Sequence, residues 1–240
     1  MKNFLSVKTI VFLTFLLAIV LHSSAQQDST NSEKFYTELT ELYGANQIPL
    51  IGKLNEHQLK SKTNHPYLNS NYQKGTITLH GITHNDVDLL YDIYEQQVVV
   101  LYLDPHNTKY GIIPPVDFIS AFNIGTMLFK QYCFNEDCNF YQVVFADTIT
   151  CLYSWHKKRA ESHENRSYVT YDYHSMKQRS YLLIDGEITE YSGNGSFVKI
   201  FPKQYKKSIT DYLKSNDIDV RKSEPETISK LVAHCQQYLQ

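Results

Sequence analysis

Residues 76–104 read TITLHGITHNDVDLLYDIYEQQVVVLYLD, and apolar residues alternate with polar ones along most of this stretch. A period of two is typical of β-strands, because successive side chains point to opposite faces of a sheet. The stretch therefore predicts three strands in a meander, at residues 76–82, 87–94 and 97–104. Polar residues at 84–86 and 95–96 are expected to form the two turns.

The middle strand predicts which side of the meander is buried. Val87, Leu89, Tyr91 and Ile93 would share one face of the sheet. The opposite face would carry Asp86, Asp88 and Asp92, and we expect that face to lie in water.

The rest of the chain adds further strand patterns. They are expected near residues 116–122, 127–132, 139–155, 167–174 and 181–184, and Asp185-Gly186 then joins the last of these to a strand at 187–191 in a hairpin. The segment 139–155 is long for a strand, and Asp147 is the place where we expect it to bend. In that segment Tyr141, Val143, Phe145, Ile149, Cys151, Tyr153 and Trp155 are expected on one side.

The carboxyl end changes to helical spacing. Pro202 can begin a helix with Tyr205, Ile209 and Leu213 on one face, and residues 223–226 have the form of a capping box before a second helix. Phe35, Leu39 and Leu42 allow a short amino-terminal helix. The predicted fold is mainly β (α+β), with an antiparallel sheet or partial barrel packed by two carboxyl-terminal helices.

Residues 1–25 have the three parts of a secretory signal. Lys2 and Lys8 form the basic start, residues 10–21 form an apolar run of 12 residues, and Ser23-Ser24-Ala25 forms the cleavage site before Gln26. A helix that crosses a bilayer needs about 20 residues, so cleavage is favoured over anchoring. We expect residues 26–240 to form one β-rich domain with its helical part at about 202–240, free in the periplasm or secreted.

Charge and composition narrow the classes of partner. The signal carries two lysines and no acid, so its removal leaves 21 basic residues against 25 acidic ones, a net charge of −4. An acidic chain is a poor nucleic-acid binder. Nineteen tyrosines and twelve phenylalanines against nine glycines favour strands over phosphate-binding loops.

Several aromatic and strand motifs carry a family resemblance. They are residues 42–44 (LYG), 65–67 (HPY), 75–78 (GTIT), 88–94 (DLLYDIY) and 201–202 (FP) followed by two helices. With these motifs the chain resembles a family of uncharacterised exported β-rich bacterial proteins, to which no function is assigned. The resemblance implies a fold and export, and supplies no catalytic residue.

The four cysteines are expected to meet an oxidising compartment after export. Cys133 and Cys138 flank four residues that can form a hairpin loop, and facing positions on adjacent strands lie within reach of a disulfide. We therefore predict a Cys133–Cys138 bond. Cys151 and Cys235 lie on apolar faces of a strand and a helix, and are either a second bridge or two buried thiols.

The chain holds one set of side chains that resembles a metal site. His80, His84, Asp86 and Asp88 lie close together in the sequence and are ligand types. Their spacing suits a strand leading into a turn, and the aspartates are explained as its solvated side, so no metal or other cofactor is predicted. The chain contains no Gly-x-Ser-x-Gly or His-Glu-x-x-His motif.

Two classes of function follow from these observations. The first is a non-enzymatic binding or structural protein of the cell envelope, with an apolar-ligand carrier as a variant. The alternative is an exported hydrolase with an unrecognised active site. A pocket that gathers acidic or histidine side chains would favour the hydrolase, and a dry apolar cavity would favour the carrier.

Overall fold

The computed structural model of the chain describes residues 52–55, 65–103, 106–134, 137–165 and 168–239, which belong to one compact unit. The predicted signal at residues 1–25, its cleavage site at Ala25 and Gln26, and the predicted amino-terminal helix lie outside these residues. Among the described residues, no helix is long and apolar enough to cross a membrane.

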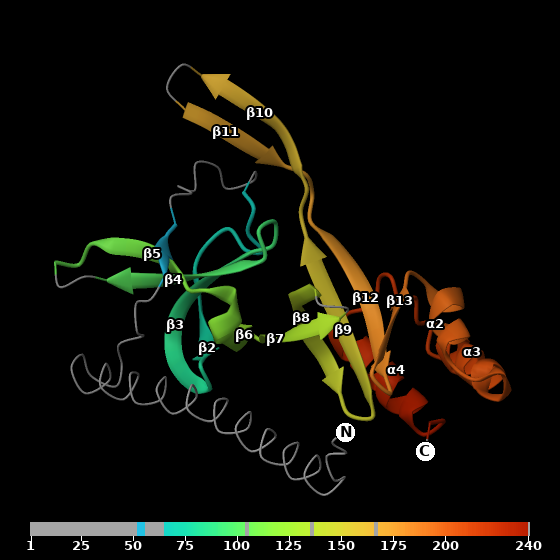
Figure 1. The fold of residues 1–240 in the computed structure, drawn as a ribbon. Helices are drawn as coiled ribbons and strands as arrows, with labels where there is room; N and C mark the ends of the chain where they lie inside the picture. Colours follow the sequence, from blue (N-terminus) through green and yellow to red (C-terminus); the bar gives the residue numbers. More distant parts are fainter. Residues whose placement is uncertain (1–51, 56–64, 104–105, 135–136, 166–167, 240) are drawn as a thin grey trace, which may run out of the picture. The chain divides into compact units, whose positions relative to one another are not determined.

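Eleven strands in the described part of the chain form one antiparallel sheet, whose order is β1-β5-β4-β3-β2-β6-β7-β8-β9-β12-β13 (Figure 1). The strands are β1 (Lys53–Leu54), β2 (Gln73–Leu79), β3 (Ile82–Asp92), β4 (Gln97–Leu103), β5 (Lys109–Ile113), β6 (Ile119–Ile124), β7 (Met127–Phe134), β8 (Asp137–Ala146), β9 (Ile149–His156), β12 (Lys177–Ile184) and β13 (Glu187–Tyr191). The predicted antiparallel sheet is confirmed, and it is open and not closed into a barrel.

The turn between β2 and β3 lies at His80 and Gly81, whose φ angles are 49° and 80°. Positive φ at both central residues gives a two-residue turn whose twist matches that of the strands. The turn predicted at residues 84–86 is wrong, because these residues lie inside β3. There the register with β2 shifts between Gly75 and Ile77, so the polar residues mark a bulge in the strand.

Residues 139–155, predicted as one bending strand, instead form β8 and β9 with a tight turn at Asp147 and Thr148. The Asp147 carboxylate accepts a hydrogen bond from the Thr148 amide at 2.8 Å. Such a bond is typical of a turn residue. The sequence therefore predicted the position of the interruption correctly, but it predicted a bend within one strand where the structure has a turn between two strands.

The predicted single apolar side of residues 141–155 is also wrong. Gln142 pairs with Tyr153, and the register of β8 then shifts before Phe145 pairs with Cys151. Paired residues share a face of the sheet, so Tyr141, next to Gln142 in β8, lies on the face opposite to Tyr153.

A separate two-stranded sheet pairs β10 (Arg159–Asn165) with β11 (Tyr168–Tyr173) (Figure 1). The sequence predicted the second of these strands, near residues 167–174, and did not predict the first. Residues 159–165 form a strand because their backbone finds hydrogen-bonding partners in β11.

The carboxyl-terminal part forms three α-helices, α2 (Asn194–Ile200), α3 (Lys206–Ser215) and α4 (Pro225–Gln236), and the short 3₁₀ turns are η1 (Val116–Phe118) and η2 (Lys203–Tyr205). The two predicted helices correspond to α3 and α4. The predicted capping box at 223–226 is wrong, since Glu224 is the N-cap of α4 and makes no side-chain cap bond. The Ser223 hydroxyl donates instead to the Asp219 carbonyl at 2.9 Å.

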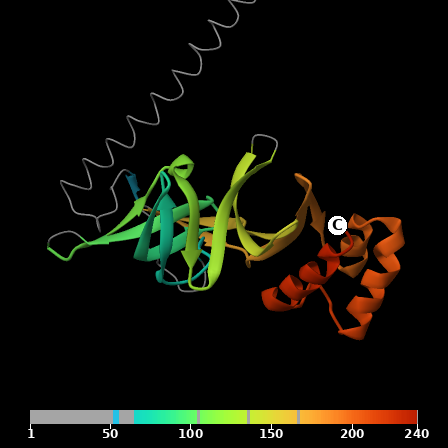
Figure 2. The same cartoon turned by 90° about the horizontal axis from the view of Figure 1, so that it is seen from below.

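These helices cover part of the sheet. α4 packs against β8 and β9, and α2 packs against β13; Figure 2 shows the three helices grouped beside the yellow and orange strands. The residues buried between them are termed the carboxyl-terminal cluster: Ile149, Cys151, Tyr153, Leu182, Tyr191, Phe197, Phe201, Ile209, Leu213, Ile218, Val220, Ile228, Leu231, Val232 and Cys235.

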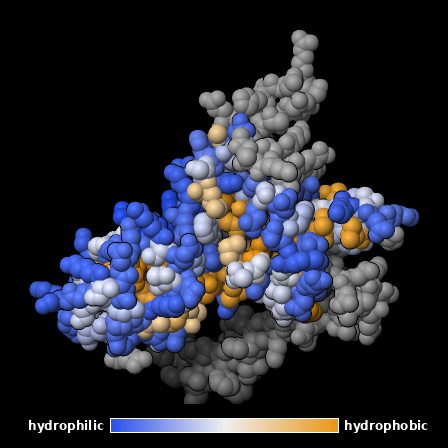
Figure 3. All heavy atoms as spheres, turned by 180° about the vertical axis from the view of Figure 1, so that it is seen from behind, coloured by the Kyte–Doolittle hydropathy of each residue, from blue (hydrophilic) through white to orange (hydrophobic). Residues whose placement is uncertain are grey.

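Aromatic rings fill a second buried part of the sheet. The Tyr91 ring meets Phe122, Phe129 and Phe140 at centroid distances of 5.1, 5.2 and 6.1 Å. The predicted burial of the Val87–Ile93 face is therefore confirmed: the four predicted side chains are at most 8% exposed. On the face drawn in Figure 3, hydrophobic residues gather in the middle with hydrophilic ones around them.

Candidate functional site

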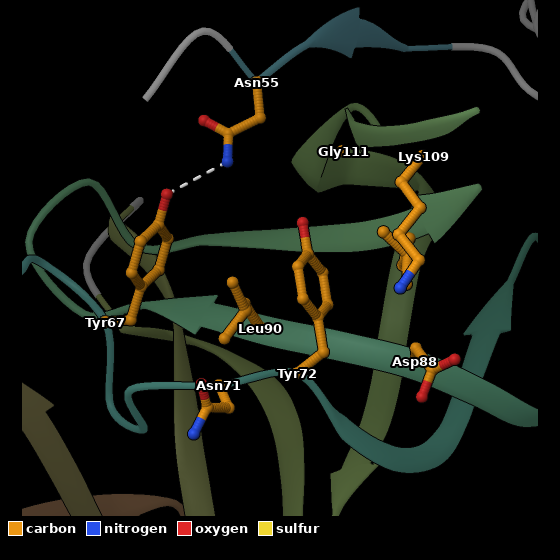
Figure 4. Close-up of a pocket in the computed structure, with 9 residues that line it drawn as sticks. Asn55, Tyr67, Asn71, Tyr72, Asp88, Leu90, Lys109 and Gly111 are labelled. Carbon is orange, nitrogen blue, oxygen red and sulfur yellow. Dashed lines mark hydrogen bonds between the residues drawn. The ribbon is translucent and has the colours of Figure 1, made fainter. Parts of the chain in front are cut away.

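An open groove with a volume of about 530 Å³ lies over strands β3, β4 and β5 (Figure 4). We term it the Tyr67–Tyr72 groove after the two aromatic side chains in its wall. Its lining consists of Asn55, Tyr67, Asn71, Tyr72, Asp88, Leu90, Leu101, Lys109 and Gly111. Small-molecule sites commonly measure about 300–1,000 Å³, so the groove has the size of a ligand site.

The floor of the groove is the face of β3 that the sequence analysis expected in water. Side chains alternate along β3, so Asp88, Leu90 and Asp92 lie opposite Leu89 and Tyr91. The expectation is confirmed for Asp86, whose side chain is 84% exposed, and it is wrong for Asp92, which is 6% exposed beside Leu90 at 2%. Residues 65–72, termed the strap, cover that face before β2 begins.

Backbone hydrogen bonds attach the strap to β3. The Leu68 amide donates to the Tyr91 carbonyl at 2.8 Å, and the Ile93 amide donates to the Pro66 carbonyl at 3.1 Å. Between these bonds Tyr67 forms a β-bridge with Asp92. The strap thus pairs with β3 at a single residue. Tyr67 is buried at this point and is 1% exposed.

Lys157 joins the strap to a distant part of the chain. Its Nζ donates to the His65 carbonyl at 2.7 Å and to the Tyr67 carbonyl at 3.1 Å. Its own amide donates to the Ile93 carbonyl at 3.4 Å. Burial lowers the pKa of the Lys157 amine, whereas the nearby Asp92 carboxylate raises it. Lys157 therefore holds the strap backbone on both sides of the Pro66–Tyr67 peptide bond through its amine.

The two tyrosine rings stand on the same side of β3, with Leu90 between their bases (Figure 4). The Tyr67 hydroxyl accepts a hydrogen bond from the Asn55 amide group at 2.9 Å. Burial raises the pKa of Tyr67, and burial together with Tyr67 raises the pKa of Tyr72 to about 12. Both phenols therefore stay neutral and keep their O–H groups at physiological pH.

Gly111 allows the upper wall of the groove to come close to the strap. A Cβ atom at this position would lie 3.0 Å from the Tyr72 hydroxyl oxygen, 3.0 Å from Val99 Cγ1 and 3.1 Å from Asn55 Cβ. The Gly111 carbonyl also accepts a hydrogen bond from the backbone amide of Asn55 at 2.8 Å. A glycine inside a strand often marks such a close approach.

The charges at the groove balance. Among the lining residues that the structure describes, Asp88 carries the single negative charge and Lys109 the single positive charge, and both lie away from Tyr67 (Figure 4). Asp88 also pairs with Lys74 at 3.3 Å, and Lys74 reaches Asp86 at 3.4 Å. The hydrogen bond with Asp88, chiefly, raises the pKa of Lys74.

The four side chains weighed as metal ligands do not come together. His80 lies in the β2–β3 turn, where the centroid of its ring is 3.9 Å from that of the Phe118 ring. His84 lies on β3. Asp86 and Asp88 both face Lys74. The described residues include no group of three or more histidine, cysteine or acidic side chains placed to hold a metal ion.

The cysteines divide into two pairs. Cys133 and Cys138 face each other on β7 and β8 and form a disulfide, in agreement with the prediction. Cys151 and Cys235 are free and buried in the carboxyl-terminal cluster. Of the two alternatives for that pair, the structure has the buried thiols, and Cys151 Sγ contacts the Tyr191 hydroxyl at 3.4 Å.

Sequence reasoning missed most of the groove. Asp88 was weighed as a metal ligand and as part of a solvated face, and Asn55, Asn71 and Tyr72 lie in or beside a segment that shows no periodicity. Strand β5, which brings Lys109 and Gly111, was not predicted at all. The glycine inside the apolar run 110–113 was the available signal, since it indicates a bulge or a close backbone approach.

No family model matches the chain, and neither a curated protein nor a solved structure matches it. The resemblance to exported β-rich bacterial proteins therefore stays a prediction. What the site can do has to be argued from its own geometry.

Proposed function

We propose that the chain is an exported, non-enzymatic binding protein and that the Tyr67–Tyr72 groove takes a small polar ligand. The observation that carries this proposal is the lining itself. Leu90 and Leu101 supply an apolar floor, while amide, hydroxyl and charged groups surround it. Ligand sites commonly combine apolar walls with a few placed polar groups that fix the ligand's orientation.

The walls of the groove are held before any ligand arrives. Tyr67 is fixed by the strap bonds, by Lys157 and by Asn55. Gly111 sets the distance between the wall and Tyr72. A site whose side chains are already ordered loses less conformational entropy on binding, which favours affinity.

The lining favours a polar ligand over a wholly apolar one. An apolar ligand would take Asn71, Asp88 and Lys109 out of water without offering hydrogen bonds, and this desolvation costs free energy. The described part of the lining also gives little support to hydrolysis. Its residues include one carboxylate and no histidine, and Lys74 already pairs with that carboxylate.

Export is supported by the signal-like residues 1–25 and by the cysteine pair on the β7–β8 hairpin. Both Cys133 and Cys138 are exposed, and disulfides persist chiefly in oxidising compartments. We therefore place the protein in the periplasm or outside the cell.

Native mass spectrometry of protein purified from its own cell envelope tests the proposal. We expect a bound small molecule in the wild type and its loss in Tyr72→Ala. Tyr110→Ala is the matched control, because Tyr110 is a tyrosine on β5 between Lys109 and Gly111 that does not line the groove. A bound molecule that survives Tyr72→Ala, or none in the wild type, would contradict the proposal.

A further inference from the structure

We infer that the ligand of the Tyr67–Tyr72 groove is a neutral saccharide whose ring lies against the tyrosine wall, with its hydroxyl groups toward the polar rim. This inference rests on the proposed binding function and names the chemical class of its ligand.

The wall and floor match one face of a sugar ring. A pyranose presents carbon-bound hydrogens on its faces and hydroxyl groups around its edge. The faces of aromatic rings carry partial negative charge and attract such hydrogens, and the apolar floor at Leu90 excludes water below them. Tyr67 is only 1% exposed, so the ring face that a sugar can reach is that of the half-buried Tyr72, which packs against the cluster containing Tyr67 (Figure 4).

The rim matches the edge of the same ring. Each sugar hydroxyl both donates and accepts a hydrogen bond. Asn71 offers an amide with both functions, Asp88 offers acceptors, and Lys109 offers donors. Tyr72 adds a hydroxyl that stays protonated.

The charges favour a neutral ligand over an anion. Among the described lining residues Asp88 and Lys109 cancel, and just outside the lining the charge of Lys74, which pairs with Asp88 at 3.3 Å, is matched by Asp86 at 3.4 Å. An acidic sugar or a phosphate would therefore meet no net positive charge from these residues. The volume of about 530 Å³ gives room for a short oligosaccharide more readily than for a single small ion.

Saturation-transfer NMR and calorimetry with three ligand panels test this inference. The first panel holds neutral gluco-, manno-, galacto- and N-acetylglucosamine trisaccharides, the second holds uronic-acid and sialylated trisaccharides, and the third holds nucleosides and dipeptides. We expect binding from the first panel, with saturation passing to carbon-bound hydrogens of the sugar. Tyr72→Ala should weaken it about tenfold or more, Tyr72→Phe should retain most of it, and Tyr110→Ala should leave it unchanged.

The outcomes separate the ligand class from the binding function. If only charged saccharides, nucleosides or dipeptides bind, and Tyr72→Ala weakens them, the saccharide inference is wrong and the groove still binds ligands. If neutral saccharides bind equally well to Tyr72→Ala, the inference is also wrong, since they bind elsewhere. If no member of any panel binds, both the inference and the proposed function are contradicted. Circular dichroism of each variant confirms that it folds.

Discussion

The carboxyl-terminal cluster and the Tyr67–Tyr72 groove occupy faces of one antiparallel sheet, yet the chain covers them differently. Three helices close over the cluster and bury 15 residues, among them Phe197 and Leu231. The groove face is covered by the short strap, and its own cluster has three buried residues, Tyr67, Leu90 and Val99. Free energy of folding scales with the apolar area buried, so the cluster carries stability and the groove is left open for a ligand.

The comparison also concerns polar groups. The cluster excludes charged side chains and keeps Cys151 and Cys235 as neutral thiols. The groove face accepts polar residues, and Lys157 and Asn55 hold its wall through hydrogen bonds. Hydrogen bonds fix geometry at modest net free energy, whereas buried apolar area supplies most of the stability.

The largest effect should come from a large-to-small change in the cluster. Phe197 is fully buried and its ring meets Tyr191 at 5.1 Å and Phe201 at 5.4 Å. We expect Phe197→Ala to reduce the free energy of unfolding by about 3–5 kcal/mol, measured by urea denaturation. Lys199→Ala, on the exposed side of the same helix, is the control. A loss below about 1 kcal/mol would break the comparison, because the cluster would then not dominate stability.

A smaller effect should appear as the pH rises above 9. Burial raises the pKa of both Cys151 and Cys235 from 9.0 to about 12. Between these values the unfolded chain releases the two thiol protons and the folded state keeps them, so stability falls as the pH rises. Urea midpoints measured from pH 8 to pH 10 should decline, and the decline should be shallower in Cys151→Ala. Parallel curves for the variant and the wild type would show that this thiol does not contribute.

The smallest effect on stability should come from the groove. Tyr72 is partly exposed and packs beside a cluster of three buried residues. We expect Tyr72→Ala to reduce the free energy of unfolding by about 1 kcal/mol, well below the loss in Phe197→Ala. Equal losses in the two variants would mean that the groove wall is part of the main core and not a separate site.

The sequence predicted the cluster better than the groove, and the reason is periodicity. The faces of α3 and α4 and the alternation of β3 and β9 repeat at regular spacing, so the class of fold and most core residues could be read from it. Tyr67 and Tyr72 belong to the strap and Asn55 follows β1, and neither segment has regular spacing. Contacts far apart in sequence place them, such as Lys157 with the His65 carbonyl. Single-sequence patterns do not encode such contacts.

The errors within the sheet have a similar origin. The polar residues at 84–86 predict a turn, and the segment through Tyr141 and Phe145 alternates in the sequence. In the structure the polar residues form a bulge in β3, and a register shift in β8 interrupts the alternation. An extra residue moves the following side chains to the other face, and only the pairing with the neighbouring strand shows where it occurs.

Backbone-amide NMR during a titration with a neutral trisaccharide tests the central claim most directly, because it reports on both regions at once. The account predicts that the amide signals of Asn55, Asn71, Tyr72 and Gly111 move on titration while those of Phe197 and Leu231 in the carboxyl-terminal cluster stay in place. Shifts confined to the cluster, or no shifts at Tyr72 and Gly111 under saturating ligand, would contradict it.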